Sequence, residues 1–554
     1  MDKPMLPQDI ILLICQELGA HREFATLYRC SMVSRRFASI AVEQLYRILE
    51  VLDPFIDDKL QAARLWRSIV LSSLGATVYP YCAYIRALSL GGLAECLEDI
   101  RFDRYLRDFF FEGPMQDFLV IQEGAMFAKN TRSKLPLFDL PAITIRCADS
   151  ITKYIKALAD NSGTAVALTQ LEGSAIPRDI LPNWMGRLGT LTSLQLRDGS
   201  VLGAEAGVAI AECCPNFAEL TCFHCSSETA AEDMAAFFLA LRPNSLQRFE
   251  VLSRNNLSEV SLAALNAHAE SLRVLSLRSL LSPATRSLHL LVKCTALESL
   301  LIERETTDRS GLDAFSESEL AEVIAWVSSC KALRELSFNH LRDALPILKG
   351  VLQTPDIRLK QLVIQDYQSA PEDITKATWG ALEQQVQLEV LTIASQDGSV
   401  DGLVLAGHPE LTHSICQLSN LISLNLMQAY VTSSEIRRIA TALPHLEELS
   451  FGGDLVDDSI LDHLSKLPKL VSLSINAITA FNFDSLQNFA QKLDPIANRG
   501  IRVDVLNQWY EAKLTEEEDT WLNAYFVEIL NGRIAISYPN DPDELHEADF
   551  SDSD

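Results

Sequence analysis

A short pattern of apolar residues recurs along most of the chain, each time after a segment with helical periodicity. Its form is apolar-x-x-apolar-x-apolar, and the alternation in its second half is that of a β-strand with one buried face. Ser or Thr at the start and acids in the first turn of segments such as SETAAEDMAAFFLAL predict helices between the strands. Eleven copies follow one another: LTSLQL, FAELTC, LQRFEV, LRVLSL, LESLLI, LRELSF, LKQLVI, LEVLTI, LISLNL, LEELSF and LVSLSI.

The spacing of these copies predicts the architecture. Successive middle residues are 26, 29, 26, 25, 36, 26, 29, 33, 25 and 24 positions apart, a period typical of leucine-rich repeats. We therefore predict an α/β solenoid, a curved parallel sheet with outer helices, regular over residues 181–499. The middle residues are Leu194, Leu220, Phe249, Leu275, Leu300, Leu336, Leu362, Leu391, Leu424, Leu449 and Leu473.

Both flanks of the regular array carry weaker signals. IRALSL at 85–90, LPAITI at 140–145 and VALTQL at 166–171 predict irregular repeats over residues 47–180. In LTEEEDTWLNAYFVEIL, Thr515 and Glu518 have the spacing of a capping box before a helix, so we interpret residues 500–536 as a C-terminal cap. Residues 537–554 end in DPDELHEADFSDSD and predict an acidic disordered tail.

The first fifty residues break the repeat pattern and predict a separate module. In LPQDIILLICQEL, apolar residues recur at helical spacing behind Pro7, which suits the first turn of a helix. ATLYRCSMVSRRFASIAVEQLYR continues with three- and four-residue steps. Two or three short helices are expected over residues 1–46. A plain helical cap for the solenoid is the alternative interpretation.

This segment resembles the F-box, whose pattern is Leu-Pro-x-Glu, an apolar helix, and then Val-Ser/Cys-Arg-x-Trp. Asp9 stands where Glu is usual and Phe37 where Trp is usual, and both departures keep the charge or the aromatic bulk. Joined to a downstream repeat array, the segment is similar to fungal F-box proteins with leucine-rich repeats. The matching positions are Leu6, Pro7, Ile10, Ile14, Leu18, Leu27, Val33, Ser34 and Arg35.

The resemblance implies a non-catalytic substrate-recognition subunit of an SCF-type (Skp–cullin–F-box) ubiquitin ligase. The F-box helices would bind a Skp-type adaptor, and through it a cullin. An adaptor-binding scaffold without a ubiquitin-ligase role is the first alternative, and an unrecognised enzyme is the second. The residues expected to divide between adaptor contact and the module's own core are Leu6, Pro7, Ile10, Ile14, Leu27, Val33 and Phe37.

The residues that alternate with the buried strand residues predict where a substrate binds. They lie one before, one after and three after each middle residue, on the concave face. This face is rich in amides and hydroxyls, which suits a protein segment better than phosphate or DNA, although solvated strand residues are the alternative. The predicted substrate contacts are Arg197, Phe223, Arg248, Arg278, Asn339, Gln365, Asn425 and Asn476.

Charge and hydropathy narrow the possible partners. The formal net charge is -27, and no concentrated basic face offsets it, so nucleic acid and membranes are not expected partners. No apolar run is long enough to span a bilayer, and the N-terminus lacks a secretory leader, so we expect a cytoplasmic or nuclear protein. The 12 cysteines are expected to be reduced thiols.

The segment CCPNFAELTCFHC, residues 213–225, has the density of a metal site, but the repeat explains it differently. Cys214 lies six residues before a middle residue, as do Cys294 and Cys330, and leucine fills that place in other copies. We interpret the position as a core slot, with Cys222 as the third strand residue and Cys225 in the turn. We therefore expect no metal. Because no nucleotide-binding, zinc-protease or serine-hydrolase motif occurs, we also expect no catalytic residues and no cofactor.

Overall fold

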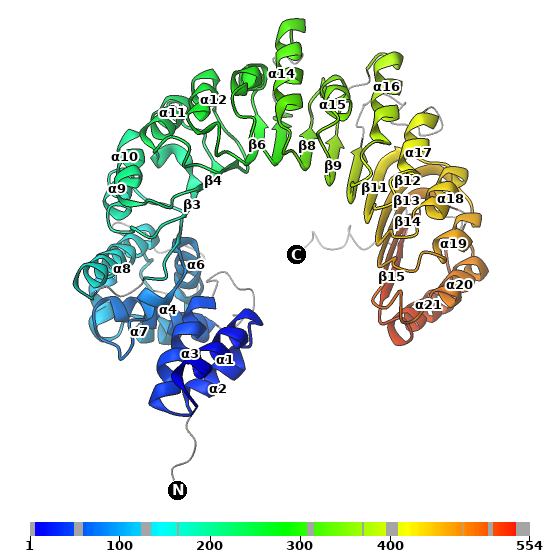
Figure 1. Cartoon of the computed structure of the whole chain (residues 1–554). Coiled ribbons are helices and arrows are strands. Elements are labelled where there is room, and N and C mark those ends of the chain that lie inside the picture. The colour runs from blue at the N-terminus through cyan, green and yellow to red at the C-terminus, as the bar shows by residue number, and fades with distance from the viewer. Residues whose placement is uncertain are drawn as a thin grey trace, which may run out of the picture. The chain divides into compact units, whose positions relative to one another are not determined.

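The computed structural model describes residues 6–48, 59–122, 135–162, 166–306, 315–367, 370–394, 408–479, 481–507 and 513–538. The chain forms two compact units, Met1–Ser271 and Leu272–Asp554. In the described ranges, fifteen parallel strands follow one another in chain order. Helices between them cover the outer face of the strands in each unit (Figure 1). No helix in these ranges has the length and apolar character needed to cross a bilayer.

The N-terminal unit begins with three short helices, α1 (Gln8–Ala20), α2 (Phe24–Ser31) and α3 (Arg35–Ile48). Pro7 precedes α1, and the side chain of Ser34 accepts a hydrogen bond from the backbone N–H of Phe37 at the start of α3. The three helices pack around a small core of their own. Its buried members are Ile11, Cys15, Leu27, Ile40 and Ala41.

The next part of this unit carries two short strands among helices. It comprises α4 (Lys59–Ser73), α5 (Tyr81–Tyr84), β1 (Ala87–Ser89), α6 (Leu90–Ile100), α7 (Arg104–Phe111), the 3-10 helix η1 (Gly113–Phe118), α8 (Leu140–Ser162) and β2 (Gln170–Gly173). The predicted copy IRALSL contains β1, with Leu88 as its middle residue. The predicted copy VALTQL is shifted, because the strand begins at Gln170 and pairs through Leu171.

The prediction of a repeat strand at LPAITI is wrong. These residues form the start of α8, where the Asp139 carboxylate accepts a hydrogen bond from the backbone N–H of Ala142. The apolar pattern continues at four-residue steps through Ile143, Cys147, Ile151 and Ile155, all of them buried. The helical period over twenty residues therefore outweighs a strand-like alternation over six.

The remainder of the N-terminal unit alternates strands and helices. It contains α9 (Leu181–Met185), β3 (Ser193–Asp198), η2 (Gly199–Val201), α10 (Ala204–Cys213), β4 (Glu219–His224), α11 (Ala230–Ala240), β5 (Arg248–Val251), α12 (Glu259–Ala264) and η3 (Leu265–His268). The middle residues of neighbouring strands pair directly, so they form one continuous buried row. That row is Leu88, Leu171, Leu194, Leu220 and Phe249.

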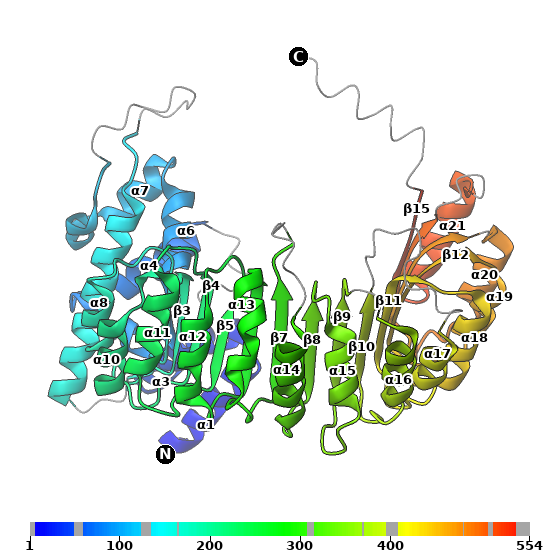
Figure 2. The ribbon, with the colours of Figure 1, turned by 90° about the horizontal axis from the view of Figure 1, so that it is seen from above.

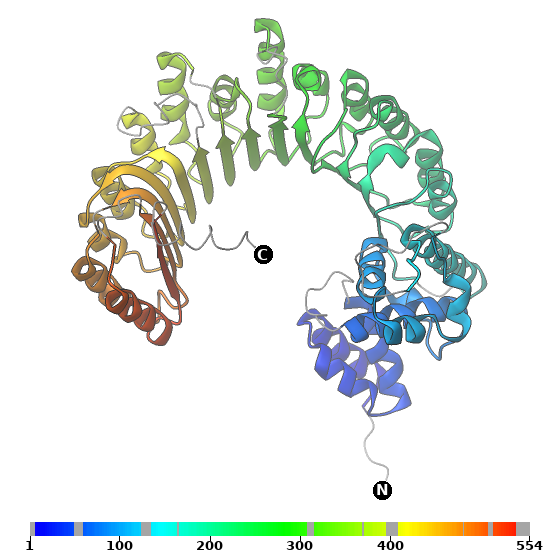
Figure 3. The ribbon, with the colours of Figure 1, turned by 180° about the vertical axis from the view of Figure 1, so that it is seen from behind.

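The C-terminal unit repeats this arrangement. Figures 2 and 3 show its strands side by side, with the helices on their outer side. Each middle residue again pairs with the next one, from Leu275 through to Ile534. The elements are β6 (Val274–Leu280), α13 (Ser282–Arg286), η4 (Ser287–Leu291), β7 (Ser299–Arg304), α14 (Glu317–Ser329), β8 (Glu335–Asn339), α15 (Ala344–Leu352), β9 (Gln361–Gln365), α16 (Glu372–Leu382), β10 (Val390–Ala394), α17 (Pro409–Ile415), β11 (Ser423–Tyr430), α18 (Ser433–Ala442), β12 (Glu448–Val456), α19 (Ser459–Leu464), β13 (Ser472–Thr479), α20 (Phe483–Lys492), β14 (Arg502–Asn507), α21 (Glu516–Glu528) and β15 (Arg533–Ser537).

The segment predicted as a C-terminal cap contributes two further strands. β14 and β15 extend the sheet, with α21 between them. The predicted capping box is present, because Thr515 and Glu518 exchange side-chain to backbone hydrogen bonds at the start of α21. The predicted acidic tail lies outside the described residues from residue 539 onward. The predicted domain boundaries stay predictions.

The cysteines that lie six residues before a middle residue are in the core, as their position in the repeat predicts. Cys214, Cys294 and Cys330 are buried, and so are Cys222 and Cys225. The Cys214 thiol donates to the backbone carbonyl of Leu188, its counterpart in the preceding repeat, at 3.3 Å. Cys330 points in the same way to the carbonyl of Cys294, at 3.6 Å. Cysteine therefore fills a leucine position and also bonds to the preceding repeat.

Candidate functional site

The first candidate surface is an apolar stripe on α1. Ile10, Leu13 and Ile14 lie at three- and four-residue spacing on α1, next to the face that carries the buried Ile11 and Cys15. Leu6 stands one turn before Ile10. All four side chains of the stripe are exposed: Ile10 by 41%, Ile14 by 39%, Leu6 by 48% and Leu13 by 59%. The module thus leaves a group of apolar side chains exposed outside its own core.

The structure separates the predicted adaptor residues into two groups. Leu27 is fully buried in the core of the three helices, and Phe37 packs against that core. Leu27 therefore belongs to the core part of the predicted division and not to the part that contacts an adaptor, because its side chain is fully buried. Adaptor contact by the exposed residues stays a prediction. The exposed group consists of Leu6, Pro7, Ile10, Ile14 and Val33.

The second candidate surface is the open face of the strands. We call the residues one position after each middle residue the first outward row, and those three positions after it the second outward row. In the N-terminal unit the first row is Ser89, Glu172, Gln195, Thr221 and Glu250. The second row is Gly91, Ser174, Arg197, Phe223 and Leu252.

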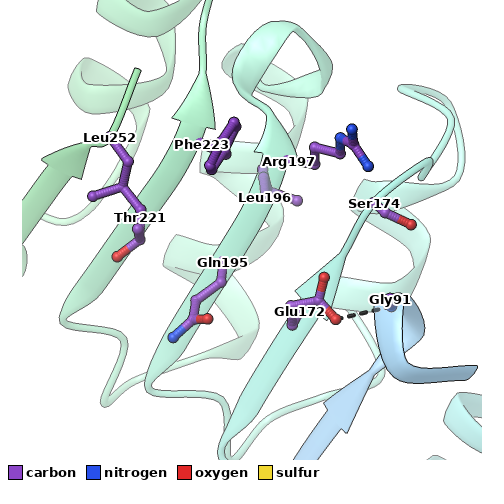
Figure 4. Close-up of a pocket in the computed structure, with 9 residues that line it drawn as sticks. All are labelled: Gly91, Glu172, Ser174, Gln195, Leu196, Arg197, Thr221, Phe223 and Leu252. Atoms are coloured by element: carbon purple, nitrogen blue, oxygen red, sulfur yellow. Dashed lines mark hydrogen bonds between the residues drawn. The ribbon is translucent and has the colours of Figure 1, made fainter. Parts of the chain in front are cut away.

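These two rows line a pocket of about 450 Å³, which we call the strand-face pocket. Figure 4 shows Thr221, Gln195 and Glu172 along one side, and Leu252, Phe223, Arg197 and Ser174 along the other. The volume lies within the range of small binding pockets in proteins. Its lining residues are Gly91, Glu172, Ser174, Gln195, Leu196, Arg197, Thr221, Phe223 and Leu252.

A carboxylate, that of Glu172, lies at one end of the pocket. Glu172 Oε2 accepts a hydrogen bond from the Ser89 hydroxyl at 2.5 Å and another from the backbone N–H of Gly91 at 2.9 Å. A Cβ atom at position 91 would lie 2.8 Å from Glu172 Oε1, so glycine is needed for this close approach. The Glu172 side chain is therefore fixed in place.

The other end of the pocket is apolar and carries a cation. Phe223 is 51% exposed and Leu252 is 39% exposed, both on the open face. Arg197 is exposed beside them, and within the described part of the chain it has no ion-pair partner. The pocket therefore combines an aromatic ring, an aliphatic side chain and an unpaired guanidinium.

The remaining predicted substrate residues lie elsewhere on the strands. Arg248 begins β5 and forms an ion pair with Glu250 at 3.0 Å, so it is not available as Arg197 is. Arg278 is exposed on β6 in the C-terminal unit. Asn339 and Gln365 pair in register on β8 and β9. Asn425 on β11 accepts a hydrogen bond from the backbone N–H of Met427, and Asn476 lies on β13.

Two of the eight predicted substrate contacts, Arg197 and Phe223, line the strand-face pocket. The prediction does not include Glu172, which lies on β2, or Gly91 and Ser174, which lie just after the ends of β1 and β2. Gly91 and Ser174 lie three residues after the middle residues Leu88 and Leu171, so the repeat pattern could have identified them. It did not, because the predicted copy VALTQL places the middle residue of β2 before Leu171.

The buried thiols are suited to packing rather than to reactivity. Burial raises the pKa of the Cys214 thiol to about 12, and it does the same for Cys294 and Cys330. A hydrogen bond to Cys225, together with burial, raises the pKa of the Cys222 thiol well above its usual range. A thiol in this state is a poor nucleophile and a poor metal ligand. Among the described residues, no group of three or more His, Cys, Asp or Glu is placed to hold a metal ion.

Comparison with known proteins adds little to this picture. Neither a protein-family model nor a curated protein matches the chain. Similar solved structures include the complex of Rad7 and Elc1 in yeast, with 17% identity over 67% of this chain and 86% of that one, and a TM-score of 0.39. An internalin (inlF) from Listeria monocytogenes shares 14% identity over 62% of this chain and 85% of that chain, with a TM-score of 0.33.

A leucine-rich-repeat protein from Leptospira interrogans shares 14% identity over 70% of this chain and 92% of that chain, with a TM-score of 0.34. At these TM-scores the likeness carries no argument about function. The α/β solenoid fold stands on the strand order, the register and the buried rows of middle residues.

Proposed function

We propose that the chain is a non-catalytic substrate-recognition subunit of an SCF-type ubiquitin ligase in the cytoplasm or nucleus. The three N-terminal helices bind a Skp-type adaptor and, through it, a cullin. The open strand face binds a protein substrate. The observation that carries the proposal is the exposed apolar stripe on α1, because it lies in the segment that resembles an F-box.

The stripe supports binding because exposure of clustered apolar residues marks an interaction surface. Full burial of one Leu or Ile side chain is worth about 1.5 to 3 kcal/mol. Three such side chains on α1, with Leu6 just before the helix, suit insertion into an apolar groove of a partner. The core of α1, α2 and α3 is made by other residues and includes neither Ile10 nor Ile14.

The strand face supports the second half of the proposal. Solenoids of stacked repeats present extended faces that bind other proteins. In this chain the first and second outward rows combine neutral polar side chains such as Gln195 and Thr221 with a few charged ones and with exposed apolar ones such as Phe223 and Leu252. Such a mixture resembles the surface of a protein–protein interface.

The direct test uses the double variant Leu6→Ala with Pro7→Ala in the full chain. We expect adaptor binding to weaken by roughly 1 to 4 kcal/mol, the range found when interface anchors are truncated. Calorimetry with a purified Skp-type adaptor measures the change. Leu239→Ala is the control, because Leu239 is an exposed leucine on α11, outside the N-terminal helices. Unchanged affinity in the double variant would count against adaptor binding by this module.

A second measurement separates a ligase subunit from a scaffold. The full chain is purified from cells, and its associated adaptor and cullin are quantified. We expect both proteins in similar amounts. Recovery of the adaptor without the cullin would favour the scaffold interpretation. Turnover of a substrate by the isolated chain would instead indicate an enzyme.

A further inference from the structure

We propose that the strand-face pocket binds an extended segment of a partner protein in which an acidic side chain lies two residues from a large apolar one. The inference rests on the proposed function, since it takes the open strand face as the surface that binds substrate. It specifies which side chains the bound segment carries and how far apart they lie in its sequence.

The apolar half of the pocket is formed by Phe223 and Leu252. Phe223 lies on β4 and Leu252 directly follows the end of the neighbouring strand β5, and both are substantially exposed. Exposed aromatic rings in pockets are typical anchors of protein interfaces, because they bury a large area with few rotatable bonds. A phenylalanine, leucine or methionine side chain of a partner would cover both residues and remove them from water.

The charged half of the pocket is formed by Arg197. Three carboxylates on the same or neighbouring strands, in the described part of the unit, already have partners. Glu172 is held by Ser89 and Gly91, and Glu250 by Arg248. Asp198 accepts a hydrogen bond from the backbone N–H of Ser200 at 2.9 Å and lies 3.5 Å from His224. The Arg197 guanidinium is left to pair with an anion from outside, and its planar fork matches a carboxylate.

The distance between the charged and the apolar half of the pocket determines how far apart the acidic and the apolar side chain of the bound segment must lie. Neighbouring strands lie about 4.8 Å apart, so Arg197 on β3 is one strand from Phe223 and two strands, roughly 10 Å, from Leu252. In an extended chain, side chains two residues apart point to the same side and lie roughly 7 Å apart. A segment that runs across the strands therefore places its acid over Arg197 and its apolar side chain between Phe223 and Leu252.

The chemistry favours a single carboxylate over a phosphate. Among the lining residues, Arg197 alone is a cation, and Glu172 adds a negative charge at the other end. Phosphate recognition generally uses several cations, whereas one arginine is enough for a carboxylate. The chain's net charge of -27 also opposes a highly charged anion.

The test measures binding of labelled peptides to the full chain by fluorescence polarisation. The probes are nine-residue Gly/Ser peptides with Asp-Gly-Phe or Phe-Gly-Asp at the centre, so that both chain directions are sampled. The comparison peptides carry Lys-Gly-Phe, Asp-Gly-Ser or phosphoserine-Gly-Phe. We expect one of the acid-and-Phe peptides to bind roughly tenfold more tightly than the lysine or serine peptide, the loss typical when one anchor is removed.

Two variants assign this binding to the pocket. Phe223→Ala is expected to weaken binding by roughly tenfold. Arg197→Glu is expected to do the same and also to reverse the preference, so that Lys-Gly-Phe binds best. The matched controls are Arg438→Glu, an exposed arginine on helix α18 with the same change of charge, and Leu239→Ala, and neither should change binding. Reversal of charge preference is a result that damage to the fold cannot produce.

Three results would overturn the inference. They are equal binding of acidic and lysine peptides, tighter binding of the phosphoserine peptide, and unchanged preference in Arg197→Glu. The outcome is independent of adaptor binding, because Arg197 and Phe223 lie on the strands and the stripe lies on α1. Loss of the proposed adaptor interaction with intact peptide binding would therefore contradict the ligase proposal alone.

Discussion

The N-terminal helices and the repeats use their apolar residues in opposite ways. In the repeats, the middle residues of all the strands are buried, and they stack on one another from strand to strand. In the helical module, Ile11 and Cys15 are buried, but Ile10, Leu13 and Ile14 on the same helix are exposed. Apolar residues in the repeats thus account for folding. Those on the stripe of α1 stay exposed, which is why we propose that they bind a partner.

This difference also shows where specificity lies. A partner of the helical module would meet a mainly apolar surface, which suits one constant adaptor. A partner of the repeats would meet the outward rows, whose residues differ from strand to strand. In the N-terminal unit the second row contains Arg197, Phe223 and Leu252, whereas in the C-terminal unit it includes Asn339 and Gln365. Variation of this kind suits recognition of one substrate among many.

The largest expected effect comes from a middle residue. Leu336→Ala removes a fully buried side chain between Leu300 and Leu362, and it should lower the free energy of unfolding by about 2 to 5 kcal/mol. Urea unfolding of the full chain, followed by circular dichroism, measures this change. A loss below about 1 kcal/mol would show that the row of middle residues is not a continuous core.

The reactivity of the cysteine thiols compares the repeats with the helical module without any substitution. Because burial raises the pKa of Cys214, Cys294 and Cys330 to about 12, these thiols should be almost entirely protonated at pH 8. Iodoacetamide should label them at least about a hundredfold more slowly than in the urea-unfolded chain. Mass spectrometry of the labelled peptides measures the rates, with the half-buried Cys30 of the helical module as internal reference. Equal labelling of Cys30 and Cys214 in the folded chain would contradict the assignment of cysteine to core slots.

A smaller effect is expected at the helix starts. α14 begins with a capping box between Ser316 and Glu319, and Glu319 also pairs with Arg286 of the preceding repeat at 3.0 Å. By contrast, α1 and α2 begin without a side-chain cap. Glu319→Gln should cost about 1 kcal/mol at pH 7, whereas Glu317→Gln, its neighbour in the same turn, should cost less. Equal costs for the two variants would show that the link between repeats adds nothing.

Glu319 should also make the stability of the folded chain depend on pH. The hydrogen bond from the Ser316 backbone N–H, followed by the Arg286 guanidinium, lowers the pKa of Glu319 from 4.5 to about 2. A carboxyl group whose pKa is lower in the folded state stabilises that state above pH 4.5, and it loses this contribution as the pH falls toward 2. Between these values, stability should fall less steeply in Glu319→Gln than in the unaltered chain. Thermal unfolding in acidic buffers measures the slopes, and identical slopes would contradict the assigned contacts.

The smallest effect on stability is expected on the stripe. Ile10→Ala removes an exposed side chain, so the free energy of unfolding should change by no more than about 0.5 kcal/mol. Leu27→Ala, in the core of the same module, should destabilise the module by about 2 to 5 kcal/mol. Urea unfolding monitored by hydrogen exchange of residues 6–48 separates the two. Similar losses for both variants would mean that Ile10 serves the fold and not a partner.

The sequence predicted the regular strands well because their pattern is redundant. Each of the eleven copies has an apolar residue three positions before the middle one, such as Leu191 before Leu194. The two C-terminal strands lack it, since Gly500 and Asn531 stand there in a left-handed backbone conformation. The sequence pattern therefore predicts a cap where the structure has β14 and β15, whose middle residues Val503 and Ile534 pair in register.

The candidate site was less predictable, for physical reasons. Helical periodicity shows which residues of the N-terminal segment are apolar, but it does not decide which of two apolar faces of α1 is buried. The packing of α2 and α3 decides that, and it buries Leu27. The pocket depends on the irregular strands β1 and β2, where Glu172 is fixed by Ser89, 83 residues earlier in the chain. A contact at that separation leaves no local pattern.

The most direct test of the account is hydrogen–deuterium exchange of the full chain with and without a purified Skp-type adaptor. The account predicts slower exchange in residues 6–48 when the adaptor is bound, centred on α1, and unchanged exchange on the strand face from β2 to β5. Protection on the strands with none in α1 would contradict the central claim, because the exposed stripe would then have no part in binding the adaptor.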